Sequence, residues 1–132
     1  MIYCDRFGYN PAIKNLENVE EHKEGKSFEN VQVAFIQVEE HDEENPKSTE
    51  KKLLNFAKWA LRKNECNHII LHSFAHLSDS KADAEFTKAL FDRVDQRLRN
   101  VDYLVDQTPF GYFLDLHVDA PGKSLARIFK AF

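Results

Sequence analysis

Three of the six histidines recur at every fourth position, and histidine is the side chain best suited to acid–base or ligand-binding chemistry near neutral pH. On a helix, His68, His72 and His76 would line one face and imitate a metal site. The apolar run Ile69–Leu71 favours extended backbone instead. In a strand the first two histidines point to one face, and His76 lies beyond it in a turn. We therefore do not predict a metal site from these residues.

His76 belongs to the segment Phe74–Ser78, which follows the predicted inner strand directly. Ligands often bind in loops at the ends of such strands. A neutral imidazole can donate one hydrogen bond and accept another, which suits a ribose hydroxyl or an attacking water. The alternative is a structural histidine that ties the loop together. Ser78 and Ser80 lack a preceding nucleophile elbow, so helix capping explains them better than catalysis.

A second turn, Pro109–Tyr112, interrupts a strand pattern about thirty residues later. Gly111 would allow a positive φ or a close approach of another backbone segment. The turn is either a substrate wall or an ordinary entry into a strand. Two turns that follow strands can meet to form one pocket, so we treat both as candidate site segments. Trp59, by contrast, is interpreted as helix-edge packing or a subunit contact rather than a substrate-stacking residue.

The composition describes one domain of ordinary globular type, with 132 residues, 42% hydrophobic and 30% charged. No apolar run is long enough to span a bilayer, and the first residues do not resemble a secretory signal, so we expect a cytoplasmic protein. Cys4 and Cys66 are too few for a disulfide framework and are expected to remain packed thiols.

The net charge of −4 argues mildly against a nucleic-acid partner, because phosphate contacts usually need a basic surface. Local basic patches could still serve that purpose. We interpret the basic runs as solvated surface, since mixed surface charge is common. These runs comprise Lys51, Lys52, Arg62 and Lys63 in one segment and Lys123, Arg127 and Lys130 in another.

The pattern along the chain predicts an α+β domain with a mixed sheet, two main helices and an N-terminal hairpin. Residues 1–14 are expected to form that hairpin, turning at Gly8–Pro11, and residues 15–30 a surface loop. Strands are expected at 31–38, 68–73, 101–105 and 112–118, with the first of these central. One helix should start at Asn45-Pro46, and a second should be capped by Asp79 or Ser80. Residues 123–132 fit a short helix or an edge strand.

Four segments of the chain resemble, in order and approximate spacing, the N-terminal editing domain of archaeal threonyl-tRNA synthetase. They are Val33–Ile36 with Val38-Glu39, Asp42–Pro46, Phe74–Ser78 and Pro109–Tyr112. That domain is related in fold to the D-aminoacyl-tRNA deacylases. The resemblance spans most of residues 1–132 and implies the same fold, with a homodimer as the typical assembly.

The resemblance also implies a proofreading activity in translation, namely hydrolysis of the ester in seryl-tRNA(Thr) or a related aminoacyl-tRNA, without a metal or other cofactor. It places His76 near the ribose as the catalytic residue. The backbone of Ser73, Phe74 and Ala75 would hold the amino acid, and Gly111 and Tyr112 would line the other side of the pocket. The implied partners are the aminoacyl-tRNA 3′ end and threonyl-tRNA synthetase.

Three positions depart from the family pattern. Phe113 and Leu114 replace a tyrosine and a lysine, and Arg127 aligns with a glutamate of the site. Loss of one such donor typically raises the activation free energy of the reaction by ~3 kcal/mol. Two hypotheses follow: a free-standing or separately expressed deacylase with altered selectivity, or a catalytically lapsed relative that binds an aminoacyl-adenosine end or serves in dimerisation.

Overall fold

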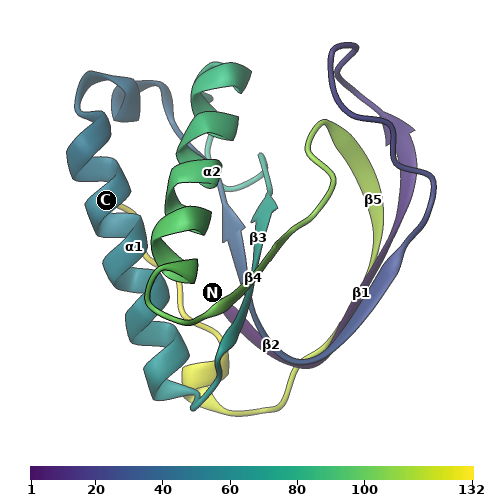
Figure 1. The fold of residues 1–132 in the computed structure, drawn as a ribbon, viewed down its shortest axis with the longest axis vertical. Coiled ribbons are helices and arrows are strands. Elements are labelled where there is room, and N and C mark those ends of the chain that lie inside the picture. Colours follow the sequence, from purple (N-terminus) through teal and green to yellow (C-terminus); the bar gives the residue numbers. More distant parts are fainter.

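The computed structural model describes residues 1–132 and has one five-stranded mixed sheet in the order β4-β3-β2-β1-β5 (Figure 1). The strands are β1 (Ile2–Lys14), β2 (Lys26–Ile36), β3 (His68–Ser73), β4 (Leu104–Gln107) and β5 (Tyr112–Asp119). Strands β2, β3 and β4 are parallel to one another, whereas β1 is antiparallel to both of its neighbours. This is the mixed α+β architecture that the sequence predicts.

Helices α1 (Pro46–Lys63) and α2 (Ala84–Arg99) lie side by side on one face of the sheet (Figure 1). The start of α1 follows the prediction, because Asn45 is the N-cap and its side chain accepts a hydrogen bond from the Ser48 N–H. Pro46 occupies the first helical position, where no N–H is needed. The apolar stripe of α1 packs on Ile69 and Leu71 of β3 to form the main core.

The start of α2 differs from the prediction of a cap at Asp79 or Ser80. Asp83 is the N-cap, and its carboxylate accepts hydrogen bonds from the N–H groups of Glu85 and Phe86. The residues before it are held in the loop, where the Ala82 N–H donates to the Val38 carbonyl oxygen at 2.9 Å. This tertiary contact delays the helix start by several residues.

The predicted N-terminal hairpin within residues 1–14 is wrong. These residues form one long strand, β1, whose Gly8 pairs with Ser27 on one side and His117 on the other. A register shift between Pro11 and Ile13 accommodates the proline, as expected of a β-bulge. The true hairpin joins β1 to β2, so residues 26–30 are strand and the connecting loop is 15–25.

The long strands β1 and β2 bend, so that their hairpin end and β5 turn away from the helices (Figure 1). A second apolar cluster covers the face of the sheet opposite the helices, with Phe7, Val33 and Ile70 among its buried members. Cys4 also lies in it, and burial raises the pKa of its thiol to about 11. Both cysteines are free thiols, as predicted.

The C-terminal residues pair with the start of β1 through backbone hydrogen bonds. After a short 3-10 helix, η2 (Ser124–Ala126), Arg127 forms an isolated antiparallel bridge with Ile2. The Ile128 N–H then donates to the Met1 carbonyl oxygen at 2.9 Å. Of the two predicted alternatives, the edge-strand arrangement is closer to this geometry. Neither helix is long and apolar enough to cross a membrane.

Candidate functional site

The loop after β3 leaves the sheet from a buried strand and carries His76. Ile69, Ile70 and Leu71 have no exposed surface, so the strand that positions the loop is fixed on both faces. The Phe74 N–H donates to the Ile36 carbonyl oxygen at 2.9 Å, which extends the pairing with β2 beyond Ser73. The Phe74 ring then contacts His76, with ring centroids 4.9 Å apart.

Gln37 clamps the far side of this loop through four hydrogen bonds. Its side-chain oxygen accepts from the N–H groups of Leu77 at 2.6 Å and Ser78 at 2.7 Å. Its side-chain nitrogen donates to the carbonyl oxygens of Ser78 at 2.8 Å and Ser80 at 2.7 Å. Sequence reasoning missed this residue, although a glutamine within the apolar run 31–38 was the available signal.

Between these two anchors, the N–H groups of Ala75 and His76 have no hydrogen-bond acceptor within the chain. The neighbouring N–H groups of Phe74, Leu77 and Ser78 all have one. Ala75 and His76 are both exposed, so their amides can be reached from solvent. Two consecutive free amides on a held loop can donate to a carboxylate, a carbonyl or a developing oxyanion.

Ser78 and Ser80 stabilise the loop and do not cap α2. The Ser78 hydroxyl donates to a carboxylate oxygen of Glu39 at 2.7 Å and accepts from the Ser80 N–H at 3.2 Å. The Ser80 hydroxyl accepts from the Glu40 N–H at 3.0 Å, at the start of the 3-10 helix η1 (Glu40–Glu44).

The other two histidines of the series have separate partners. His68 Nε2 lies 2.7 Å from a carboxylate oxygen of Asp106, and His72 Nδ1 lies 2.9 Å from the Thr108 hydroxyl. Both rings contact phenylalanines of the second apolar cluster, which agrees with their predicted common face. Burial lowers the pKa of His72 to about 4, so this ring is neutral at pH 7.

The His72–Thr108 contact connects the strand ends from which the two candidate loops begin. His72 lies near the end of β3, and Thr108 begins the connection from β4 to β5. The Thr108 N–H also donates to the Leu71 carbonyl oxygen at 3.1 Å, which extends the pairing of β3 with β4. The two loops therefore start from adjacent strands. Beyond this point the second loop crosses toward the hairpin end of β1, where Tyr112 pairs with Lys14 (Figure 1).

Gly111 has a φ of 83°, which is one of the two possibilities that its residue type allows. A Cβ at this position would lie 2.9 Å from a methyl carbon of Val19 and 3.1 Å from Leu16 Cβ. The Gly111 carbonyl oxygen also accepts from the Asn15 N–H at 2.7 Å. The glycine thus allows the loop 15–25 to close over this turn.

Tyr112 holds the same loop through its hydroxyl, which accepts from the His22 N–H at 2.9 Å. Phe113 follows with 53% of its surface exposed. Leu114 is half-buried and packs against the second apolar cluster, while its backbone pairs with Pro11. A side chain in this apolar contact contributes to packing and offers no hydrogen-bond donor.

Arg127 lies apart from the second loop within one chain. It bridges Ile2, at the opposite end of β1 from the residue that pairs with Tyr112. Its exposed guanidinium donates to the Ala120 carbonyl oxygen at 3.5 Å. Of the predicted site residues, the fold therefore brings the bases of the two loops together and leaves Arg127 elsewhere.

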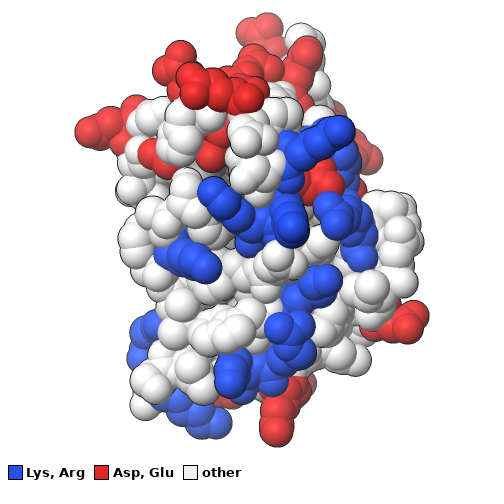
Figure 2. All heavy atoms as spheres, turned by 90° about the vertical axis from the view of Figure 1, so that its left-hand side faces the viewer, with Lys and Arg blue, Asp and Glu red and all other residues white.

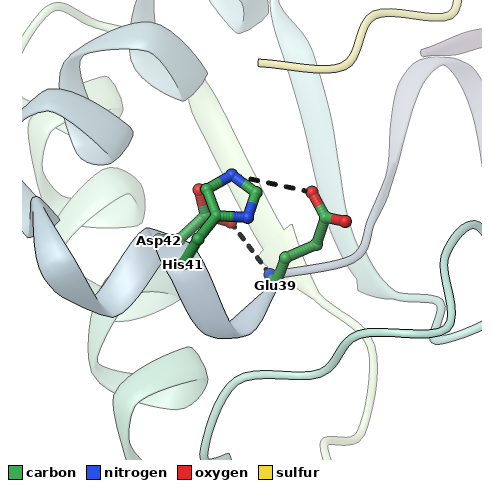
Figure 3. A group of neighbouring side chains, drawn as sticks. All are labelled: Glu39, His41 and Asp42. Carbon is green, nitrogen blue, oxygen red and sulfur yellow. Dashed lines mark hydrogen bonds and ion pairs between the residues drawn. The ribbon is translucent and has the colours of Figure 1, made fainter.

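Glu39, His41 and Asp42 form a group whose potential ligand atoms lie within 4.8 Å of one another (Figure 3). Their oxygens already have structural partners. Asp42 accepts from the Glu39 N–H at 2.9 Å and from the Thr49 hydroxyl at 3.4 Å, and Glu39 accepts from Ser78. We assign these side chains to capping η1 and to supporting the His76 loop.

The fold is that of the D-aminoacyl-tRNA deacylase-like proteins. A solved structure titled c-Myc DNA unwinding element binding protein matches this chain with a TM-score of 0.62 and 13% sequence identity. The match covers 91% of this chain and 89% of that one, and at this identity it defines the fold alone.

Within that fold, the chain belongs to the archaea-specific editing domain family of threonyl-tRNA synthetase, whose family model matches residues 1–132. It is 30% identical to a threonine–tRNA ligase of Pyrococcus furiosus over 131 residues, which is 97% of this chain and 21% of that protein. It is 29% identical to the Thermococcus onnurineus enzyme, with the same coverage. The chain thus spans about one fifth of the length of these relatives.

Proposed function

We propose that this domain hydrolyses the ester between a mischarged amino acid and the 3′-terminal ribose of a tRNA, with seryl-tRNA(Thr) as the first candidate substrate. Membership of the editing-domain family supports an editing-type role on tRNA. The observation that carries the hydrolytic step is the pair of free N–H groups at Ala75 and His76, on a loop held by Gln37.

The proposed chemistry needs orientation and charge stabilisation more than a strong nucleophile. Water adds to the ester carbonyl carbon, and the carbonyl oxygen becomes an oxyanion. The free amides of Ala75 and His76 are suited to receive that charge. We assign the His76 ring a hydrogen bond to the ribose or to the attacking water. Collapse of the intermediate breaks the bond between the carbonyl carbon and the ribose oxygen, and that oxygen takes the proton that the water gives up. The amino acid and the free ribose hydroxyl are the products, so no redox step or covalent enzyme intermediate is required.

A second candidate function has its own support. Leu114, which replaces the family lysine, packs into the second apolar cluster, and the Tyr112 hydroxyl is engaged by the loop 15–25. Neither side chain offers a free donor for catalysis. These observations favour a lapsed relative that binds an aminoacyl-adenosine end or acts in dimerisation.

Deacylation of seryl-tRNA(Thr) by the unmodified protein and by His76→Ala tests the primary proposal. We expect turnover above background, reduced roughly 100-fold or more in the variant. His117→Ala is the matched control, because His117 is exposed on β5 and is outside the proposed site. Background rates for both the unmodified protein and His76→Ala would reject hydrolysis of this substrate.

A non-hydrolysable seryl-adenosine analogue separates the two functions. Binding by a protein that shows no turnover would support the lapsed relative, and loss of that binding in His76→Ala would locate it at this loop. Leu114→Lys addresses the departure from the family directly. If position 114 serves the site, this change should raise the deacylation rate or the preference for serine, and an unchanged rate would place residue 114 outside it.

We further propose that the domain acts as a homodimer in the cytoplasm, together with threonyl-tRNA synthetase. Family membership supports the association with the tRNA and the synthetase. Sedimentation velocity tests the dimer, and a single species at the 15.4 kDa monomer mass would contradict it.

A further inference from the structure

The outer face of α1 and the C-terminal residues form a groove that the proposed reaction does not use. Lys52, Phe56, Trp59 and Arg62 line it from α1, and residues 128–130 with Phe132 line it from the C-terminal segment. We call this the α1 groove. Figure 2 faces this side of the molecule and shows lysine and arginine side chains across its middle and lower part, with most of the acidic residues at the top and a few at the right and lower edges.

The cations of α1 outnumber its carboxylates and have no ion-pair partners. The helix contains six lysines and arginines and one carboxylate, Glu50. Glu50 is occupied by two arginines of α2, Arg93 at 2.5 Å and Arg97 at 2.7 Å. None of the six cations of α1 forms an ion pair within the chain. A net charge of −4 for the whole chain therefore conceals a locally basic face.

Aromatic rings are interleaved with these cations. Phe56 and Trp59 stack at 6.1 Å between centroids with planes 26° apart. The Lys130 ammonium lies 5.6 Å from the centroid of the Phe56 ring, and Phe129 is 73% exposed. Aromatic faces combined with cations are the features by which proteins bind single-stranded nucleic acid, since bases stack and phosphates pair.

The α1 groove is continuous with the loop that carries His76. A neighbouring hollow shares Phe56, residues 128–130 and Phe132 with it and extends to Leu77 and Ser78. The acidic residues Glu39 and Asp42 also line that hollow but do not line the α1 groove. These carboxylates would repel phosphates, so the basic, phosphate-binding part is confined to the outer half, along α1.

We propose that the α1 groove binds the single-stranded 3′ region of an RNA and leads its terminal nucleotide toward the His76 loop. The inference rests on the proposed function for the identity of the RNA as a tRNA. In this arrangement Lys52 and Arg62 contact phosphates, and Trp59 stacks with a base. This assigns Trp59 a stacking role, in place of the helix-edge packing or subunit contact expected from the sequence.

A second copy of the chain is the competing occupant of this surface. Two copies related by a twofold axis through the groove would oppose the same unpaired lysines and arginines, which is unfavourable. An RNA backbone supplies the opposite charge. Charge complementarity therefore favours the RNA.

Binding of a labelled single-stranded RNA ending in CCA, followed by fluorescence anisotropy over a range of salt concentrations, tests the proposal. The double variant Lys52→Glu, Arg62→Glu should weaken binding and reduce the salt-dependence slope by about 1.4, at about 0.7 for each cation lost on a single strand. Trp59→Ala should weaken binding roughly 5- to 150-fold, as for loss of one base stack.

Lys23→Glu, Lys26→Glu is the matched control. Each double variant moves the net charge from −4 to −8, because each reversal removes one positive and adds one negative charge. Lys23 and Lys26 are exposed and lie near the end of the β1–β2 hairpin, away from the groove. If both double variants weaken RNA binding equally, the loss results from the change in overall charge, and the proposal is overturned.

Trp59 is the only tryptophan, so its emission reports on the groove directly. RNA should quench it in the unmodified protein, and RNA binding without any change in emission would place the RNA elsewhere. A change in emission with protein concentration alone, together with a dimer that Trp59→Ala disrupts, would identify a second copy as the occupant. Hydrolysis of a seryl-adenosine ester, which lacks the RNA, tests the catalytic proposal separately.

Discussion

Lowering the pH from 7 to 4 should destabilise this protein through His72. This residue is 5% exposed, and its ring is surrounded by Phe35 at 5.1 Å, Phe74 at 5.9 Å and Phe7 at 6.4 Å between centroids. Its neutral partner, the Thr108 hydroxyl, cannot compensate a positive charge as a carboxylate would. Burial therefore lowers the pKa of His72 from 6.5 to about 4 in the folded protein.

The sign follows from proton binding. As the pH falls, the unfolded chain protonates this histidine first, so the native state loses stability between about pH 6.5 and pH 4. Above the pKa of the unfolded chain His72 is neutral in both states, so the protein keeps its full stability there. A pKa difference of this size corresponds to about 3 kcal/mol, against a total stability of roughly 5–15 kcal/mol for a typical domain.

Urea denaturation at intervals from pH 7 to pH 4 measures this effect, with His72→Asn as the comparison. Asparagine keeps a polar atom for Thr108 and does not titrate in this range. Carboxylates titrate in both proteins, so the difference between their pH profiles isolates His72. Parallel profiles for the two proteins would refute the assignment of a low pKa to His72.

Three further changes probe the loops and the helix that position the site. Gln37→Leu removes four hydrogen bonds and should cost about 2 kcal/mol, with faster amide exchange at Leu77 and Ser78; unchanged exchange would mean that the clamp is dispensable. Gly111→Ala should cost at least about 2 kcal/mol in urea denaturation, since φ is 83° and a Cβ would meet Val19 at 2.9 Å. Asp83→Ala should cost about 1 kcal/mol by removing the α2 cap, and a neutral result in thermal unfolding would contradict that role.

The segments with strong local signals were predicted well. The strand at 68–73 is confirmed with the same bounds, because a continuous apolar run between polar residues leaves little choice of structure. The cap at Asn45 and the start of α1 at Pro46 are also confirmed, since both depend on residues adjacent in sequence. The positive φ at Gly111 likewise agrees with its residue type.

The errors occurred where a local signal competed with a distant contact. Gly8 and Pro11 are typical turn residues, yet pairing of β1 with strands on both sides keeps them extended. Asp79 and Ser80 are good caps, but hydrogen bonds with Gln37 and Glu40 hold their segment in the loop. Local propensity is worth less than a set of long-range hydrogen bonds, and those partners cannot be identified from the sequence alone.

The sequence by itself determined the family, the fold class and the two segments that bear candidate site residues, because motifs and apolar periodicity are local properties of the chain. Only the tertiary structure decided how the loops are held and what each can offer. Gln37 and Thr108 meet their partners across roughly forty residues of chain, which leaves the Ala75 and His76 amides free and buries His72. Hydrogen-bond satisfaction depends on the arrangement of the whole molecule, so it appears only once the chain has folded.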